Sequence, residues 1–279
     1  MKNQKDKIWF ITGASSGFGL ALVKHLLANG NKVAATSRNK KSLEEKTGGD
    51  NSNLLAMTVD ITNEKAVKKA IEETVTTFGR IDVMVNNAGY MLLGSLEEVS
   101  AEEFHQSMSV NIYAFLHVIR NAMPYFRKQK SGHIFNFSSS AGYSGDENAG
   151  SYNAVKYAVI GLSEALSKEV EPFDVRVTVV SPGLFRTNFL SKGAFSVAQN
   201  KIDEYDTQQK VDIMNQFNGQ QPGDPQKLAE IVIQTAEEAN PPLHLIMGTD
   251  AYERVTGYYQ SQLTDLEKRE KVSCSTNFN

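Results

Sequence analysis

The stretch that decides the fold is KIWFITGASSGFG (residues 7–19), in which a short apolar run ends at a turn with three glycines. The apolar run, residues 7–11, predicts a buried β-strand. Apolar residues then recur at helical spacing over residues 20–29, and Gly30 is a suitable residue to end the helix. The sequence therefore begins with a strand, a glycine-rich turn and a helix.

The rest of the chain repeats this alternation of short apolar runs with helical patterns. Further strands are predicted at residues 32–36, 54–59, 81–85, 134–137, 175–180 and 244–247. Helices are predicted at 41–46, 63–78, 101–130, 151–170 and 225–238, and from 250 onward, with Pro124 bending or breaking the longest. The runs are continuously apolar, which is typical of a parallel sheet covered on both faces. We expect one α/β domain over residues 1–279, a doubly wound parallel sheet (Rossmann fold) with helices on both faces.

Two segments lie outside this alternation. Residues 184–223 are polar with scattered apolar positions, and they are too long for a plain loop. We expect a substrate loop or lid there, because the segment directly follows a strand end; a surface insertion of short helices is the alternative. Residues 249–279 are expected to form a C-terminal helix and tail.

The composition limits the classes of partner. The 279 residues carry a net charge of −3, which produces no strong field toward nucleic acid or an anionic membrane. The single cysteine, Cys274, cannot form an internal disulfide, and neither a signal peptide nor an apolar run of membrane-span length is evident. The five histidines show no metal-ligand spacing. We expect a cytoplasmic protein with no nucleic-acid, membrane or metal partner.

The glycine-rich turn indicates a nucleotide site. In doubly wound sheets the first turn receives a pyrophosphate, with the following helix directing free N–H groups at it. Gly13 lets the chain leave the strand, and Gly17 and Gly19 leave room for the diphosphate and for helix packing. Turns collect glycine in any case, so the position between strand and helix carries the argument. The residues expected at the cofactor also include those between the glycines: Ser15, Ser16 and Phe18.

Three further strand ends are expected to meet the nucleotide. The second strand ends at Ser37 and Arg38, with no acid before Glu44, which favours the 2′-phosphate of NADP(H) over NAD(H). The alternatives are a solvent-facing Arg38 and a mixed cofactor preference. At the end of the third strand, Asp60 and Ile61 would meet the adenine. At the end of the fourth strand, Asn87, Ala88 and Gly89 would allow the backbone to approach the cofactor closely. A helix cap at Asp60 and a simple turn at residues 86–89 are the rival interpretations.

The stretch HIFNFSSSAGYSGDENAGSYNAVK (residues 133–156) carries candidate proton-transfer groups. A buried strand ends at three serines, and a glycine-containing loop leads to Tyr152 and Lys156. Those two residues share one helix face because they lie four positions apart. A phenol, an ammonium group and the Ser139 hydroxyl would therefore converge at one end of a strand. Ser138 and Ser140 compete with Ser139, although Ser138 should point to the opposite side of the strand.

These motifs together resemble the classical short-chain dehydrogenase/reductase superfamily. The matching residues are Thr12-Gly13-x-x-x-Gly17-x-Gly19, Asn86-Asn87-Ala88-Gly89, Asn111, Ser139, Tyr152-x-x-x-Lys156 and Pro182-Gly183, in the family's order. The likeness is strong over residues 7–190 and looser beyond. Three stretches look most like the 17-beta-hydroxysteroid-dehydrogenase-like branch: residues 9–13, Gly89-Tyr90 and Pro241-Pro242-Leu243.

The resemblance implies a role for each matching residue. Tyr152 would be the general acid in reduction and the base in oxidation, with Lys156 and the oxidised nicotinamide lowering its pKa toward neutrality. Ser139 would orient the carbonyl oxygen, and Asn111 would link a water to Lys156. Asn111 as a helix-interrupting polar residue is the alternative. Contacts to the nicotinamide ribose and carboxamide would come from Tyr152, Lys156, Pro182, Gly183 and Thr187. Family members usually pair through helices near 112–130 and 151–170, which predicts a homodimer or homotetramer.

The function predicted from the sequence is NADPH-dependent reduction of a hydrophobic ketone or aldehyde to the alcohol, or the reverse reaction. The alternatives are a non-redox epimerase or dehydratase on the same fold and a nucleotide-sensing binding protein. Apolar residues expected to wall the substrate pocket are Tyr90, Met91, Leu92, Leu93, Tyr143, Leu184, Phe185, Phe189 and Phe195. The loop residues Asp146, Glu147 and Asn148, with Tyr143, are candidates for substrate choice.

Overall fold

The computed structural model describes residues 7–49, 51–191 and 195–278, and its core is a seven-stranded, entirely parallel sheet. The strand order is β3-β2-β1-β4-β6-β7-β9. The strands are β1 (Ile8–Ile11), β2 (Lys32–Ser37), β3 (Leu54–Thr58), β4 (Val83–Asn86), β6 (Gly132–Phe137), β7 (Val175–Pro182) and β9 (His244–Met247). The predicted doubly wound sheet is confirmed, and each strand lies within about two residues of its predicted position.

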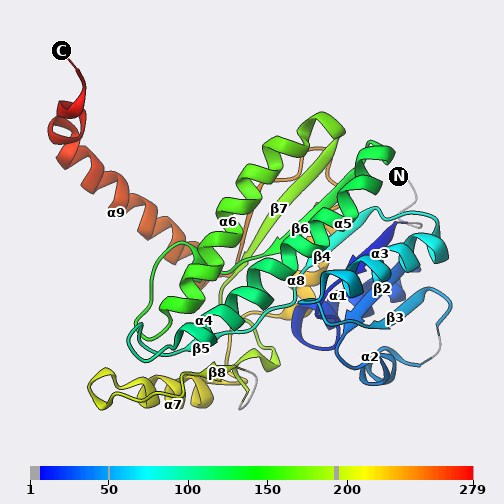
Figure 1. Ribbon diagram of the computed structural model, residues 1–279, viewed down its shortest axis with the longest axis horizontal. Coiled ribbons are helices and arrows are strands. Elements are labelled where there is room, and N and C mark those ends of the chain that lie inside the picture. Colours follow the sequence, from blue (N-terminus) through cyan, green and yellow to red (C-terminus); the bar gives the residue numbers. More distant parts are fainter. Residues whose placement is uncertain (1–6, 50, 192–194, 279) are drawn as a thin grey trace.

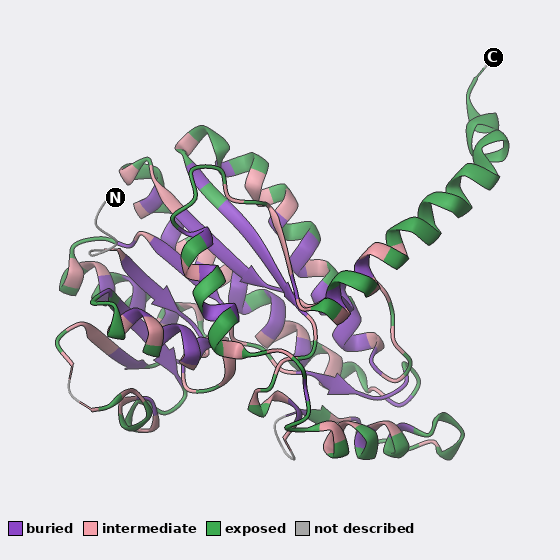
Figure 2. Cartoon of the chain, turned by 180° about the vertical axis from the view of Figure 1, so that it is seen from behind, coloured by how far each residue is buried: buried purple, intermediate pink, exposed green. Residues whose placement is uncertain are grey.

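Helices cover both faces of this sheet (Figure 1). They are α1 (Gly17–Ala28), α2 (Lys40–Thr47), α3 (Glu64–Phe78), α4 (Ala101–Met108), α5 (Ala114–Gln129), α6 (Gly150–Val170), α7 (Thr207–Phe217), α8 (Pro225–Thr235) and α9 (Thr249–Ser273). Side chains of α1 and α8 pack with Trp9 and Ile11 on one face. Side chains of α3 and α5 pack with Phe10 on the other. Successive residues of β1 thus pack against helices on opposite faces of the sheet, as strand geometry requires. The buried strands lie between helices whose outer surfaces are exposed (Figure 2).

The predicted helix over residues 101–130 is divided in the structure, and the division is not at the proline. A π-helical turn, Ser109–Tyr113, separates α4 from α5, whereas Pro124 lies inside α5. Within the π-helical turn, the amide Nδ2 of Asn111 donates to the Ser107 carbonyl oxygen at 3.0 Å. That carbonyl is the one an α-helical backbone would pair with the Asn111 N–H, so the side chain competes with the helix.

The segment predicted as a lid is attached to the body of the protein at several of its described residues. Its short strand β8 (Ser196–Val197) pairs in parallel with β5 (Leu92–Leu93). The buried carboxylate of Glu98 accepts hydrogen bonds from the Thr207 hydroxyl at 2.6 Å and from the Ile202 N–H at 3.1 Å. Burial acts to raise the pKa of Glu98, but these bonds and those from Ser95 outweigh burial and lower it. The carboxylate form of Glu98 therefore holds α7 and the chain before it against the body.

The C-terminal helix α9 is packed only at its base. Ala251 and Val255 are buried, whereas residues 259–278 are all exposed. The helix consequently projects away from the sheet (Figures 1 and 2). Over the described part of the chain, neither α9 nor any other helix has the length and apolar character needed to cross a bilayer.

Candidate active site

The glycine-rich turn lies where β1 meets α1, and its glycines are required by the local geometry. Gly13 and Gly17 have φ values of +66° and +53°, a region that favours glycine. A Cβ on Gly19 would lie 2.5 Å from the Gly13 carbonyl oxygen and 2.7 Å from Asn87 Nδ2. Asn87 Nδ2 also donates to the backbone oxygens of Thr12 and Gly13, at 2.9 and 3.1 Å. The end of β4 thus holds the turn in a conformation with no space for a Cβ at Gly13 or Gly19.

The beginning of α1 is suited to an anion. Its N-cap residue, Ser16, makes no side-chain capping bond within the described structure, whereas Asn39 and Asn63 cap α2 and α3. The first-turn N–H groups and the positive end of the helix dipole are then free to face a phosphate. Thr187 lies beside this turn, since its Cβ would be 3.7 Å from a Cβ on Gly17. The residues present therefore fit a dinucleotide's pyrophosphate.

One cationic residue follows β2, and a second, on α2, contacts the glycine-rich turn. Arg38 is exposed just beyond β2, while the Ser37 hydroxyl is buried and donates to the Asn39 carbonyl oxygen at 2.7 Å. Lys46, on α2, donates from Nζ to the Ser15 carbonyl oxygen at 3.0 Å. Sequence reasoning missed Lys46, although its place on the helix that follows Arg38 was a usable signal.

Asp60 and Ile61 make local contacts. The Asp60 carboxylate accepts hydrogen bonds from the N–H and the hydroxyl of Thr62, at 2.9 and 2.7 Å. The carbonyl oxygen of Ile61 is bonded to His117 Nδ1 at 3.1 Å. Asp60 therefore closes the turn before α3, which Asn63 caps. A contact of these residues with adenine stays a prediction.

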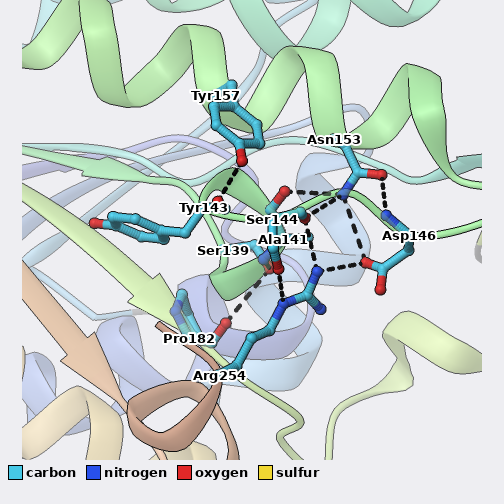
Figure 3. Close-up of polar contacts among 9 residues, drawn as sticks. All are labelled: Ser139, Ala141, Tyr143, Ser144, Asp146, Asn153, Tyr157, Pro182 and Arg254. Carbon is cyan, nitrogen blue, oxygen red and sulfur yellow. Dashed lines mark hydrogen bonds and ion pairs between the residues drawn. The ribbon is translucent and has the colours of Figure 1, made fainter. Parts of the chain in front are cut away.

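Ser139 and Tyr152 meet at the end of β6. Ser139 Oγ donates to the Pro182 carbonyl oxygen at 3.4 Å (Figure 3) and accepts from the Ala141 N–H at 3.2 Å. Burial raises the pKa of Tyr152 to about 12, an effect that the Ser139 side chain partly offsets and the charge of Asp146 reinforces. At neutral pH Tyr152 is a protonated phenol held beside a serine hydroxyl.

Lys156 is buried one helical turn after Tyr152. Its Nζ donates to the Phe137 carbonyl oxygen at 3.0 Å and lies over the Tyr152 ring, 5.6 Å from the centroid. Burial lowers the pKa of Lys156 to about 8. The lowering of the Tyr152 pKa toward neutrality by Lys156 together with an oxidised nicotinamide stays a prediction, whereas in the chain by itself the pKa of Tyr152 is raised. Burial outweighs the lysine, whose charge is itself disfavoured and lies over the ring face.

Asn111 and Lys156 both lie beside Gly89. A Cβ on Gly89 would be 2.6 Å from Asn111 Oδ1 and 3.9 Å from Lys156 Nζ. The fully buried Asn111 amide also donates to the Tyr90 carbonyl oxygen and accepts from the Tyr90 N–H, at 3.2 and 3.3 Å. Asn111 both interrupts the helix and faces the lysine, so its two sequence interpretations are compatible.

The two other serines face elsewhere. Ser138 Oγ donates to the Lys156 carbonyl oxygen at 2.8 Å, inside the core. Ser140 is buried at the start of a single 3₁₀ turn, Ser140–Gly142. Of the three hydroxyls, that of Ser139 is the one that affects the pKa of Tyr152.

Part of the expected substrate wall surrounds Tyr152. Met91, Leu93 and Phe195 share a buried cluster with it, and Phe189 packs at its edge with rings 6.1 Å apart. Tyr143 does not belong to this wall, because its hydroxyl is bonded to His244 Nδ1 at 3.0 Å and its ring packs toward α9.

Other residues expected in the wall differ in their positions. Phe185 packs edge-on against Phe18 in the sheet core, and Leu184 is 43% exposed. Leu92 is buried, and its carbonyl oxygen accepts from Ser151. Tyr90 is half-buried, and its phenol lies near Ser107 and Glu103. The apolar wall is thus built mainly by Met91 and Leu93 and by Phe189 and Phe195.

Comparisons with known proteins identify the family. The family model described as short chain dehydrogenase matches residues 7–194. The chain belongs to the short-chain dehydrogenase family. Among the described residues, no group of His, Cys, Asp and Glu side chains could hold a metal ion.

Relatives share most of the chain's length. A short-chain dehydrogenase of Streptomyces avermitilis superposes with a TM-score of 0.89 at 32% identity, covering 97% of this chain and 100% of that one. The 3-ketodihydrosphingosine reductase of Bacteroides thetaiotaomicron is 35% identical, covering 88% of each chain. The 3-ketoacyl-(acyl-carrier-protein) reductase of Brucella melitensis, solved with NADH, has a TM-score of 0.74 at 27% identity, covering 89% and 99%. The chain is an oxidoreductase of this family, and its 17-beta-hydroxysteroid-dehydrogenase-like branch stays a prediction.

Sequence reasoning missed the polar residues that hold the site's loops. Asn153, next to Tyr152, bonds three backbone groups of the loop that follows Ser139. Asp250 and Arg254, at the base of α9, bond two separate loops. Asn153 could have been suspected from its place beside Tyr152. Asp250 and Arg254 lie about 100 residues from Tyr152 along the chain, so no local pattern indicates them.

Proposed function

We propose that the protein reduces a hydrophobic ketone or aldehyde to the alcohol with NADPH, and catalyses the reverse oxidation. The observation that carries this proposal is the protonated Tyr152 phenol, beside the Ser139 hydroxyl and within an apolar cluster. An uncharged donor in an apolar setting suits a carbonyl oxygen that gains negative charge as it reacts.

The steps follow from the groups present. A bound reduced nicotinamide supplies the hydride that adds to the carbonyl carbon. Ser139 holds the carbonyl oxygen, and Tyr152 gives that oxygen its proton as the new C–H bond forms. Lys156, one helical turn away, stabilises the phenolate left on Tyr152, and Asn111, which lies beside Gly89 as Lys156 does, leads a water to Lys156. In oxidation, Tyr152 takes the proton from the alcohol.

The preference for NADPH rests on charge at the end of β2. Arg38 is exposed there, and Lys46 is held over the glycine-rich turn by its bond to Ser15. Two cations suit a 2′-phosphate, and the buried Ser37 contributes a hydroxyl rather than a carboxylate. NAD(H) is the alternative cofactor, with Asp60, Ile61, Asn87 and Ala88 along the nucleotide in either case.

The substrate class follows from the wall of the pocket. Met91, Leu93, Phe189 and Phe195 offer apolar surface near Tyr152. A relative whose name describes the reduction of a keto compound supports a ketone. Residues 184–223 would act as the lid over this substrate, and Pro182, Gly183 and Thr187 would line the nicotinamide side.

We propose a homodimer or homotetramer paired through α5 and α6. Tyr113, at the end of the π-helical turn before α5, and Tyr157 and Leu162, on α6, are 41%, 41% and 40% exposed. Large apolar side chains in such positions suit burial against a second copy.

The test is a panel of apolar ketones, aldehydes and alcohols with each cofactor, followed at the absorbance band of reduced nicotinamide. The expected result is net consumption of NADPH with an apolar carbonyl, at a higher kcat/KM than with NADH. Conversion of a substrate without net change in that band would instead support an epimerase or dehydratase. Tight nucleotide binding without conversion of any compound would support the nucleotide-sensing protein.

A further inference from the structure

The base of α9 carries two charged residues that hold two different loops of the site. Asp250 and Arg254 lie four positions apart, so they share one side of the helix. Neither residue contacts the other in the described structure. Each bonds a segment that follows the carboxyl end of a central strand, β7 for Asp250 and β6 for Arg254.

Asp250 holds the segment after β7. Its carboxylate accepts the Leu184 N–H at 2.7 Å, and a Cβ on Gly183 would collide with it. Gly183 itself donates to the Met247 carbonyl oxygen at 2.8 Å, immediately before α9. This segment extends from Pro182, which accepts the Ser139 hydroxyl bond, to Thr187 beside the glycine-rich turn. Asp250 therefore fixes the chain that lies between the catalytic serine and the nucleotide turn.

Arg254 holds the segment after β6 (Figure 3). Its Nε donates to Ser144 Oγ at 2.6 Å, and its Nη2 donates to the Ser144 carbonyl oxygen at 2.7 Å and to Asp146 at 2.8 Å. The side chains of Arg254 and Asp146 are 29% and 35% exposed, so solvent only partly screens this ion pair. The planar guanidinium satisfies three acceptors at fixed angles, which an ammonium group cannot reproduce.

The same segment is tied to the residue beside Tyr152. Asn153 Oδ1 accepts the Asp146 N–H at 2.9 Å, and its Nδ2 donates to the carbonyl oxygens of Ala141 and Ser144 at 2.9 and 3.2 Å. Asn153 is buried in the first turn of α6. The loop between Ser139 and Tyr152 is thus held from one side by α6 and from the other by α9.

We propose that Arg254 and Asp250 are positioning residues at the base of α9. Arg254 positions the loop on the substrate side of the site, and Asp250 positions the segment on the cofactor side. This inference rests on the proposed function, which assigns one side of the site to the substrate and the other to the cofactor. Arg254 acts through Ser144, Asp146 and Asn153 on the Ser139–Tyr152 pair. Asp250 acts through Gly183 and Leu184 on the segment that leads to Thr187.

The experiment compares Arg254→Met, Arg254→Lys and Asp250→Ala with Arg269→Met, which removes a charge from the exposed end of the same helix. NADPH affinity is measured by fluorescence titration without substrate. The kcat and KM for a reducible ketone are measured at saturating NADPH, and melting temperature is recorded for each variant.

Each of the two residues should affect a different measured quantity. Arg254→Met lowers kcat about tenfold and leaves the NADPH Kd within about twofold, since it loses charge-assisted bonds on the substrate side. Asp250→Ala raises the NADPH Kd about fivefold and leaves kcat at saturating cofactor within about twofold. Arg254→Lys restores part of kcat, and Arg269→Met resembles the wild type. If Arg254→Met does not fold, the kcat of Arg254→Lys gives the same comparison.

A merely structural role for these residues gives a different result. If both variants lower kcat and weaken NADPH binding together, in step with a lower melting temperature, the positioning roles are wrong. They are also wrong if neither variant differs from Arg269→Met. If the wild type converts no carbonyl compound but Asp250→Ala still weakens NADPH binding, the proposed function fails while the role of Asp250 stands.

Discussion

The burial of Lys156 leads to a prediction about stability and pH. Burial lowers its pKa from 10.5 to about 8, and each pH unit corresponds to about 1.4 kcal/mol. Below pH 8 the folded and unfolded chains are both protonated at this amine, so the folded state bears the full cost of burying the charge, about 3 kcal/mol. Between pH 8 and 10.5 the unfolded chain keeps a proton that the folded chain has lost. This lysine therefore makes the unfolding free energy rise with pH in that range.

Lys156→Met removes this titration. The free energy of unfolding of the variant minus that of the wild type should decrease by about 2 kcal/mol between pH 7 and pH 10. Loss of the bond to the Phe137 carbonyl oxygen adds an offset that does not vary with pH. Urea unfolding without cofactor at pH 7, 8, 9 and 10 measures the difference, with Lys168→Met, an exposed lysine of the same helix, as control. A difference that is constant over this range, or one that grows with pH, would refute the stated burial of the lysine charge.

Four other substitutions test separate parts of the structure. Arg38→Ala should raise the KM for NADPH at least about tenfold, through a lost charge-assisted bond, and that for NADH less than about twofold; equal changes would contradict a 2′-phosphate role. Gly19→Ala should weaken binding of either cofactor at least about fivefold by titration, since its Cβ would meet the Gly13 carbonyl oxygen at 2.5 Å. Unaltered cofactor binding by Gly19→Ala would contradict the lack of space in the turn. Gly161→Ala should stabilise the protein by about 0.5–1 kcal/mol in urea unfolding, because a Cβ at this position of α6 would meet nothing within 4 Å. The lowered pKa of Glu98 means that its contribution is present above the ordinary value of 4.5 and is lost as pH falls through the lower folded value. Acid unfolding of Glu98→Gln should therefore show a weaker pH dependence than the wild type, and an identical profile would count against this anchor.

The sheet could be predicted from the sequence because its signals are local. Each parallel strand is a continuous apolar run, since both faces are buried, and glycine or polar residues mark its end. Asn63 was recognisable as a helix cap for the same reason. The division of the helix at residues 109–113 was foreseen only as the alternative interpretation of Asn111, because it depends on a side chain that also bonds Tyr90, 21 residues away.

The candidate site was predictable where residues follow directly on a strand or share a helix turn. Ser139 follows β6, and Tyr152 and Lys156 share a turn of α6. The position of Tyr143 was not, because its partner His244 lies 101 residues away and draws the ring toward α9. The contact of Arg254 with the loop after Ser139 spans 110 residues and leaves no periodic pattern in the sequence.

The most direct test of the proton-transfer role is Tyr152→Phe, which removes the phenol and keeps the ring. With NADPH and a carbonyl compound that the wild type reduces, turnover should fall by at least about a thousandfold, while the NADPH Kd stays within about threefold. Those values would place the lost interaction at the proton transfer rather than in cofactor binding. Turnover comparable to that of the wild type would contradict the assignment of Tyr152 as the general acid.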